Sequence, residues 1–239
     1  MKHISEQYEQ ELSQIRDTLM ELGGLVELQV NNACSALVTH DVTLAEDVRD
    51  QEPTVNQLEV EIDDQCVAIL AKRQPTAGDL RAVVSVMKVI TDLERIGDEA
   101  DRIASIAIDF SDLTQPDDQY ADFRNIHTSA VKILRRTLDA FARSDVEAAL
   151  RVFEDDEKID RAYNKTVRQS IAAMQNNPEE IERTVRLMWA TKALERIGDH
   201  AKNISEYVIY QVKGKDIRHA DRTDEQWTEQ LNPSKSIDN

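Results

Sequence analysis

The six residues LERIGD occur twice in this 239-residue chain, about a hundred positions apart. Each copy holds two acids four residues apart, Glu94 with Asp98 and Glu195 with Asp199. Side chains four apart lie on the same face of an α-helix, so each pair brings two carboxylates together. Like charges at this spacing destabilise a helix slightly, and a bound cation would reverse that effect. Carboxylate oxygens are preferred ligands of Mg²⁺, Mn²⁺ and Ca²⁺, so this spacing is suited to a metal site.

Further acids at the same spacing stand ahead of each hexapeptide. Asp156 and Asp160 precede the second copy, and Glu52 and Asn56 hold the equivalent positions in the first half. Two adjacent helices of the second half could therefore supply four carboxylates and an amide oxygen, whereas the first half has an amide in place of one carboxylate. The candidate metal ligands are Glu52, Asn56, Glu94, Asp98, Asp101, Asp156, Asp160, Glu195, Asp199 and Asn203.

The same acidic stripes have a simpler interpretation. Acid-rich helix faces are usually solvated, and Arg95, Arg102 or Arg196 could pair with them at a small benefit each. The glycine between the two acids costs a helix roughly 1 kcal/mol relative to alanine. A neighbouring helix that approaches closely, or a bound ion, should offset that cost. The residues alone leave both interpretations open.

Apolar residues recur at steps of three and four along most of the chain, which predicts an all-α fold. Thr39 or Asp41 is expected to cap a short helix, and Pro53 to begin a new one, because proline suits a first helical turn. Thr76 is a plausible cap for the helix that carries the first hexapeptide. The long helices are expected over residues 4–38, 53–72, 77–109, 118–143 and 179–212.

The second half repeats the layout of the first, with Asp145 standing opposite Asp41. We therefore expect two tandem antiparallel three-helix bundles related by an internal repeat. The expected domains are residues 1–113 and 117–215, joined by a polar linker around Pro116 and followed by a polar, mobile tail over 216–239.

Composition narrows the classes of function. The chain has 46 acidic and 29 basic residues and a formal net charge of −17, which argues against broad nucleic-acid binding. It lacks a histidine pattern such as HExxH, a glycine-rich phosphate loop and a GxSxG nucleophile motif, so we expect no enzymatic activity. The N-terminus is polar and no run of about 18 apolar residues occurs, so a cytoplasmic protein is expected.

Four longer motifs resemble the PhoU family over about residues 3–219. They are AKRQPTAGDLR (71–81), LERIGDEADRIA (93–104), LDAFARSDVEAALRV (138–152) and ALERIGDHAKNISEYVIYQVKGKDIRH (193–219). The resemblance implies two tandem three-helix bundles. It also implies a cytoplasmic, non-enzymatic regulator of phosphate uptake, commonly a homodimer, that reaches the membrane only through its partners.

The expected partners are the high-affinity phosphate ABC transporter and a sensor histidine kinase. Through them the protein would restrain phosphate import and keep the phosphate-starvation genes off when phosphate is plentiful. Some family members carry iron or zinc clusters on E/DxxxD motifs, and some bind manganese or magnesium. The motif maps onto Asp156/Asp160, Glu94/Asp98 and Glu195/Asp199, and only imperfectly onto Glu52/Asn56, so the second half is the better expected site for Mg, Mn, Zn or Fe.

Two other classes of function remain open from the residues. A metal-buffering helical protein would use the same acidic stripes without any signalling role. A metal-dependent hydrolase would use paired carboxylates for acid–base catalysis.

Overall fold

A computed structural model describes residues 2–109, 111 and 120–217, and within these residues every regular element is a helix. The first half contains α1 (Lys2–Thr39), α2 (Val42–Arg73) and α3 (Ala77–Asp109). The second half contains α4 (Ala121–Arg143), α5 (Val146–Asn176), a 3-10 turn (Pro178–Glu180) and α6 (Ile181–Lys213). The all-α prediction and the repeat of three helices are confirmed.

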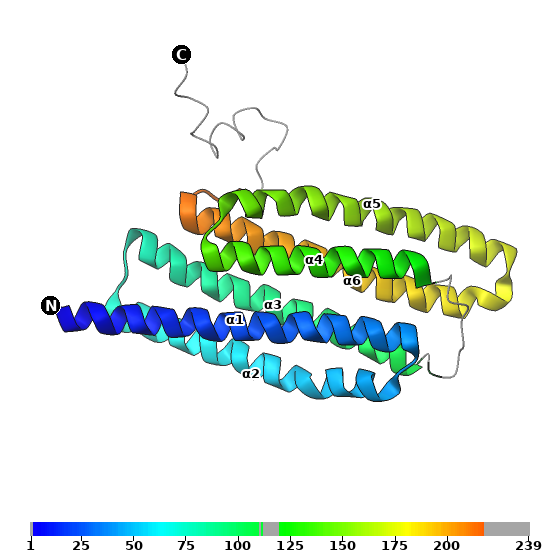
Figure 1. The fold of residues 1–239 in the computed structure, drawn as a ribbon, viewed down its shortest axis with the longest axis horizontal. Coiled ribbons are helices and arrows are strands. Elements are labelled where there is room, and N and C mark those ends of the chain that lie inside the picture. Colours follow the sequence, from blue (N-terminus) through cyan, green and yellow to red (C-terminus); the bar gives the residue numbers. More distant parts are fainter. Residues whose placement is uncertain (1, 110, 112–119, 218–239) are drawn as a thin grey trace, which may run out of the picture.

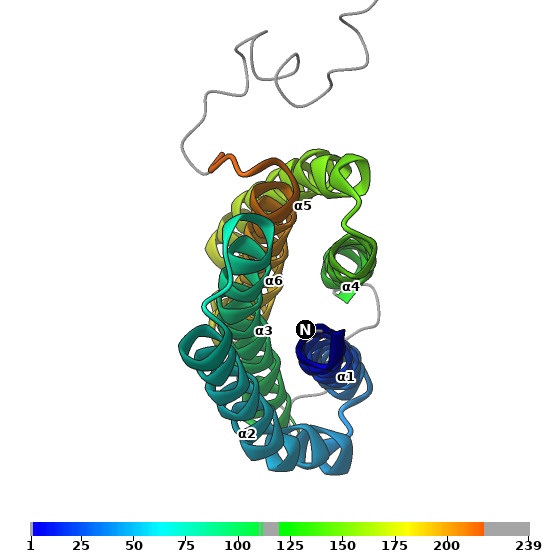
Figure 2. The same ribbon diagram turned by 90° about the vertical axis from the view of Figure 1, so that its left-hand side faces the viewer.

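The six helices run along the long axis of the molecule (Figure 1). Seen along that axis, α2, α3, α6 and α5 form a curved row, and α1 and α4 lie together on its inner side (Figure 2). Each half is an antiparallel three-helix bundle, and its apolar residues form a single core with those of the other half. The predicted core stripe of the first hexapeptide helix, from Val89 through Leu93 and Ile96 to Ile103, is fully buried.

Equivalent aspartates begin the second helix of each half. Asp41 accepts a hydrogen bond from the backbone N–H of Leu44 at 3.0 Å, and Asp145 accepts one from Ala148 at 2.9 Å. Each side chain satisfies a backbone donor that the first turn of the helix leaves free. The predicted correspondence of the two aspartates is confirmed, and of the two caps considered for the first half, Asp41 is the one that forms.

The predicted helix break at Pro53 is wrong, because α2 continues through it from Val42 to Arg73. Proline removes one backbone donor from a helix interior and crowds the preceding turn. Val48 and Val55 are buried in the core on either side of Pro53, whereas Pro53 itself faces solvent. Tertiary packing of this apolar stripe therefore outweighs the local penalty.

A ladder of polar contacts joins α3 to α6 and sets their antiparallel register. Near one end the Arg81 side chain donates to the backbone oxygen of Gln211, and near the other Arg186 lies 3.5 Å from Asp109. Between these ends, Asp92 contacts His200 and Asn203, and Glu99 contacts Arg196. The two halves therefore meet along the full length of the two helices that carry the hexapeptides.

A second antiparallel pair, α1 with α4, joins the halves on the inner side of the curve. Gly23 marks a close contact between them, since a Cβ added there would lie 2.7 Å from Leu138 Cδ2. Asn31 contacts His127, and Glu27 pairs with Arg135. The halves are thus joined on both sides of their common core.

Some predictions fall on residues that the structure does not describe. These are the linker over 112–119 and the tail from residue 218 onward. Within the described helices, no segment is long and apolar enough to cross a membrane.

Candidate functional site

The glycine of each hexapeptide lies where the second helix of its half approaches most closely. A Cβ added to Gly198 would lie 3.1 Å from Asp156 Oδ1 and 3.3 Å from Ile159 Cδ1, both on α5. A Cβ added to Gly97 would lie 3.3 Å from Val55 Cγ1 on α2. The duplicated glycine therefore admits a neighbouring helix, and this approach brings the acids of the two helices side by side.

In the second half, a lysine lies between the acids predicted to bind a metal. Lys202 Nζ donates to Asp156 Oδ2 at 2.6 Å and to Asp199 Oδ1 at 3.2 Å, so its ammonium bridges α5 and α6. Lys192 forms an ion pair with Glu195, which lies three residues further along the same helix, α6. The charge expected of a bound cation is supplied in this structure by lysine side chains.

Burial makes the Asp156 carboxylate the most constrained group of this cluster. Its side chain is only 3% exposed, and desolvation raises its pKa although Lys202 acts in the opposite direction. Burial alone would lower the pKa of Lys202, but its bonds to Asp156 and Asp199 raise the pKa overall. Asp156 Oδ1 is buried and has no hydrogen-bond partner among the described residues. A buried oxygen in that state could accept a further cation or donor.

Two other predicted ligands of the second half have separate surroundings. Asn203 donates through Nδ2 to Asp92 Oδ1 of α3 at 3.1 Å, so its amide belongs to the contact between the halves. Asp160 lies near enough to Asp156 to help raise the pKa of that carboxyl. Asp160 therefore stays with the acidic cluster, whereas Asn203 does not.

In the first half, the acids lie close to one another, and among the described residues no lysine pairs with them. Burial raises the pKa of Glu94, and the nearby charges of Asp98, Glu59 and Glu52 raise it further. Among the described basic residues, Arg95 alone pairs with Glu94, at 3.6 Å. The first half therefore concentrates more uncompensated negative charge than the second.

The two remaining candidate metal ligands of the first half, Asn56 and Asp101, form hydrogen bonds with neighbouring side chains. Asn56 Nδ2 donates to Glu52 Oε1, one turn away on the same helix. Asp101, predicted to continue the acidic stripe, accepts a hydrogen bond from Arg49 Nε of α2 at 3.0 Å.

The structure thus gathers acids in each half but does not assemble a finished metal site. Within the described part of the chain, no three carboxylate, imidazole or thiolate side chains converge on a common point for an ion. The oxygen donors suit a hard cation by their chemistry. In the second half an ion would have to displace Lys202, and in the first half the side chains would have to turn toward one another.

Sequence reasoning missed the lysines, although a signal was present. Lys192 stands three residues before Glu195, and Lys202 three residues after Asp199. Residues three apart on a helix are neighbours, so this spacing indicates internal ion pairs. The pairing of Lys202 with Asp156, 46 residues away, became evident only from the packing of α5 on α6.

Comparison with known proteins places the two halves in one family. The PhoU domain model matches residues 19–107 and 123–208. The chain belongs to the PhoU family. It is 46% identical over 217 residues to the phosphate-specific transport system accessory protein PhoU homolog of Pseudomonas aeruginosa, covering 91% of this chain and 90% of that protein. It is 42% identical over 219 residues to the corresponding PhoU of Escherichia coli K12, with 91% and 90% covered.

Solved PhoU structures share the fold. PhoU from P. aeruginosa has a TM-score of 0.85 at 44% identity, and the match covers 87% of this chain and 100% of that one. A PhoU from Streptococcus pneumoniae, described as a phosphate transport system regulatory protein, has a TM-score of 0.81 at 27% identity, with 87% and 98% covered. The predicted family and fold are confirmed, while the predicted domain boundaries and metal ligands stay predictions.

The close approach at Gly198 predicts opposite outcomes for two glycine-to-alanine substitutions. Gly24 has no atom within 4 Å of an added Cβ, so Gly24→Ala should stabilise the protein by about 0.5–1 kcal/mol through helix propensity. Gly198→Ala should instead destabilise it by about 1 kcal/mol, because the added Cβ would crowd Asp156 Oδ1 and Ile159 Cδ1, and these two buried side chains would have to shift. Urea unfolding followed by circular dichroism measures both, and equal stabilisation by the two would contradict the role assigned to Gly198.

Lys202 provides a second prediction, on the charge balance of the acidic cluster. Lys202→Met should cost about 3 kcal/mol of unfolding free energy in metal-free buffer, because Asp156 is then buried without its counter-charge. Lys165→Met is the matched control, since Lys165 is 62% exposed and lies 3.8 Å from Asp122. The control should change stability by no more than about 0.5 kcal/mol. Equal effects of the two substitutions would show that Lys202 is not the compensating charge.

Proposed function

We propose that this protein is an accessory regulator of a phosphate-specific transport system. The observation that carries the proposal is the 46% identity, over 91% of the chain, to a protein named for that role. The agreement extends to the fold, with a TM-score of 0.85 to the solved PhoU of P. aeruginosa. The protein acts by binding and does not catalyse a reaction.

The finer proposal is a cytoplasmic adaptor, working as a homodimer, between the phosphate ABC transporter and a sensor histidine kinase. When phosphate is plentiful, it restrains import and keeps the phosphate-starvation response off. The architecture supports this role, because helices of 31–38 residues such as α1, α2 and α5 present long continuous faces to partners. A core shared by both halves gives those faces a fixed relative position.

We further propose that the acidic clusters bind a cation, with Mg, Mn, Zn and Fe as the candidates. Glu195 and Asp199 of α6, with Asp156 and Asp160 of α5, would hold it in the second half. Support comes from the buried, unpartnered Oδ1 of Asp156 and from Lys202, which already marks the place for a positive charge. In the first half, burial raises the pKa of Glu94, and the nearby charges of Asp98, Glu59 and Glu52 raise it further. A bound cation would stiffen each helix pair by removing the repulsion between carboxylates.

The adaptor proposal is tested by binding to the cytoplasmic parts of the phosphate transporter and of its sensor kinase, with and without a chelator. We expect the purified protein to bind both, and the double variant Glu195→Ala/Asp199→Ala to bind less in the presence of metal. Glu154→Ala/Glu157→Ala is the matched control, because both acids are exposed on α5 and outside the cluster. Failure to bind either partner would overturn the adaptor role, whereas binding that ignores the chelator and the cluster variant would overturn only the metal proposal.

The two alternative functions have their own signatures. A metal buffer would hold many rapidly exchanging ions per chain, which equilibrium dialysis with metal analysis would reveal. A hydrolase would turn over phosphate esters in the presence of Mn²⁺ or Mg²⁺.

A further inference from the structure

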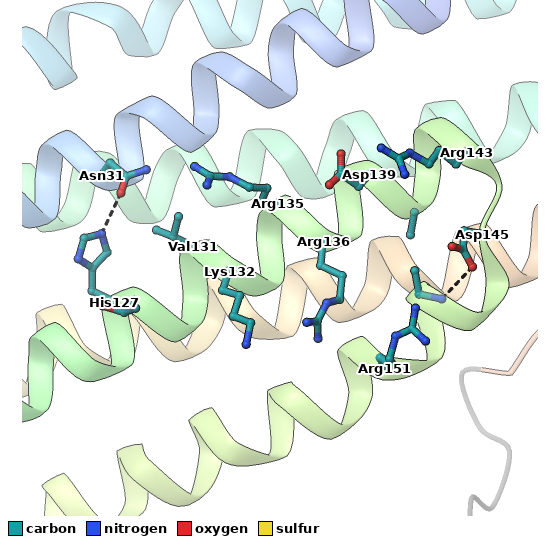
Figure 3. Close-up of a pocket in the computed structure, with 13 residues that line it drawn as sticks. Asn31, His127, Val131, Lys132, Arg135, Arg136, Asp139, Arg143, Asp145 and Arg151 are labelled. Atoms are coloured by element: carbon teal, nitrogen blue, oxygen red, sulfur yellow. Dashed lines mark hydrogen bonds between the residues drawn. The ribbon is translucent and has the colours of Figure 1, made fainter.

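A second, oppositely charged feature lies between α4, α5 and the edge of α1. It is a groove with a volume of about 680 Å³, which is within the size range of small-molecule sites. Its lining includes five bases and only two acids, although the chain as a whole carries a net charge of −17. The basic residues are Lys132, Arg135, Arg136, Arg143 and Arg151 (Figure 3). We call this feature the basic groove.

The two acids of the groove, Asp139 and Asp145, do not balance the charge of its five bases. Asp145 caps α5 by accepting from the Ala148 N–H, which leaves Asp139 as the other acidic side chain of the lining. Burial lowers the pKa of His127 at the far end, so its ring is neutral at pH 7 and adds no charge. The basic groove therefore has a positive excess that comes from lysine and arginine.

Two of the five bases have no acidic partner among the described residues. Arg135 pairs with Glu27, Arg136 with Asp155 and Arg151 with Glu147. Lys132 and Arg143 form no such ion pair within the part of the chain that the structure describes, and both are exposed on α4. The charge of Lys132 also reaches α5, where Lys158, Arg136 and Lys132 lower the pKa of Asp155 although its burial acts in the opposite direction.

The internal repeat shows that the bundle does not require these charges. α1 ends at Thr39 and α4 at Arg143, each just before an aspartate cap, which aligns the two helices. In that alignment Leu28 stands at the position of Lys132, and Thr39 at that of Arg143. The remaining basic positions of the groove are matched in the first half by Asn31, Asn32 and Asp47. The same helical framework is therefore built once without bases at these positions. Arg135 and Arg136 form ion pairs with neighbouring helices, whereas Lys132 and Arg143 form no ion pair among the described residues and are not required by the fold.

The shape of the charge distribution points to an elongated ligand. Lys132 and Arg143 are eleven residues apart on α4, which is about 16 Å along the helix axis. Arg136 lies between them in sequence, and Arg151 of α5 lies on the side of α4 toward which Lys132 and Arg136 point (Figure 3). A single phosphate ion would reach only part of this row. Four of the five bases are arginines, whose planar guanidinium groups match pairs of phosphoryl oxygens.

We propose that the basic groove binds a small anion with several phosphoryl groups in a row, such as inorganic tripolyphosphate or the triphosphate of a nucleotide. Lys132 and Arg143 bind the two ends of the phosphoryl chain, and Arg136 and Arg151 can turn from Asp155 and Glu147 toward its middle. The groove lies on α4 and α5, away from the acids of the hexapeptides, and its ligand is independent of the transporter and kinase partners proposed above.

The test is isothermal titration of the metal-free protein with tripolyphosphate, orthophosphate and ATP. We expect saturable binding of tripolyphosphate with one ligand per chain, much weaker binding of orthophosphate, and loss of affinity as salt is raised. ATP binding at the affinity of tripolyphosphate would show that only the phosphoryl chain is read, and tighter ATP binding would identify a nucleotide as the ligand. If neither tripolyphosphate nor ATP binds saturably up to about 1 mM, the proposal is overturned, and an acidic protein segment becomes the favoured occupant of the groove.

Variants locate the site. Lys132→Ala and Arg143→Ala should each weaken tripolyphosphate binding about tenfold, and the double variant about a hundredfold. Arg161→Ala/Lys165→Ala is the matched control, because it removes one arginine and one lysine that are 67% and 62% exposed on α5 outside the groove. Thermal unfolding of each variant separates a loss of binding from a loss of fold. Equal weakening by the control double variant would reduce the binding to general charge attraction and contradict the proposal.

Discussion

The central constraint on this molecule is that two buried carboxylates of α3, Asp92 and Glu99, have their polar partners on α6. Asp92 lies between His200 and Asn203, and Glu99, only 3% exposed, lies 2.7 Å from Arg196. A buried charge without a partner costs several kcal/mol, so the two helices cannot slide or part without that penalty. The contacts are also asymmetric, because α3 supplies the acids and α6 the bases and the amide. The repeat has therefore diverged where its halves meet, and this divergence fixes one register between them.

With α3 and α6 fixed at the centre, the positions of the other helices follow. α2 and α5 pack on their outer flanks against Gly97 and Gly198, which places the acids of the hexapeptides beside those of the neighbouring helix. α1 and α4 pack together on the inner side of the curve. The basic groove lies between α4 and α5, with Asn31 of α1 at its edge. One framework thus holds an acidic cluster on α2 and α3, a second on α5 and α6, and a cationic groove between α4 and α5. The two halves share a fold but differ in charge, because Lys202 lies in the acidic cluster of the second half whereas no lysine among the described residues pairs with that of the first.

Much of the fold could be predicted from the sequence because its signals are local. The period of apolar residues predicted the helices, and Asp41 and Asp145 marked equivalent helix starts. Pro53 misled because its local preference is overridden by burial of the residues around it, which only the assembled core shows. The structure places acids of α5 beside those of α6, but Lys202 between them could not be predicted, because Lys202 and Asp156 are 46 residues apart and meet only when α5 packs on α6. The basic groove was not predicted from the sequence for the same reason. Arg151 lies on α5 and comes close to the bases of α4 only because the chain turns between the two helices.

The central claim is that the ion pair between the buried Glu99 of α3 and the partly exposed Arg196 of α6 holds the two halves as one unit. A double-mutant cycle of Glu99→Gln and Arg196→Met, measured by urea unfolding, tests it most directly. We expect a coupling energy of about 2 kcal/mol and a single cooperative transition in the unmodified protein. The exposed pair Glu157 and Arg161 of α5 is the reference, with a coupling of no more than about 0.5 kcal/mol. A Glu99–Arg196 coupling as small as that reference, or separate unfolding of the two halves, would contradict the account.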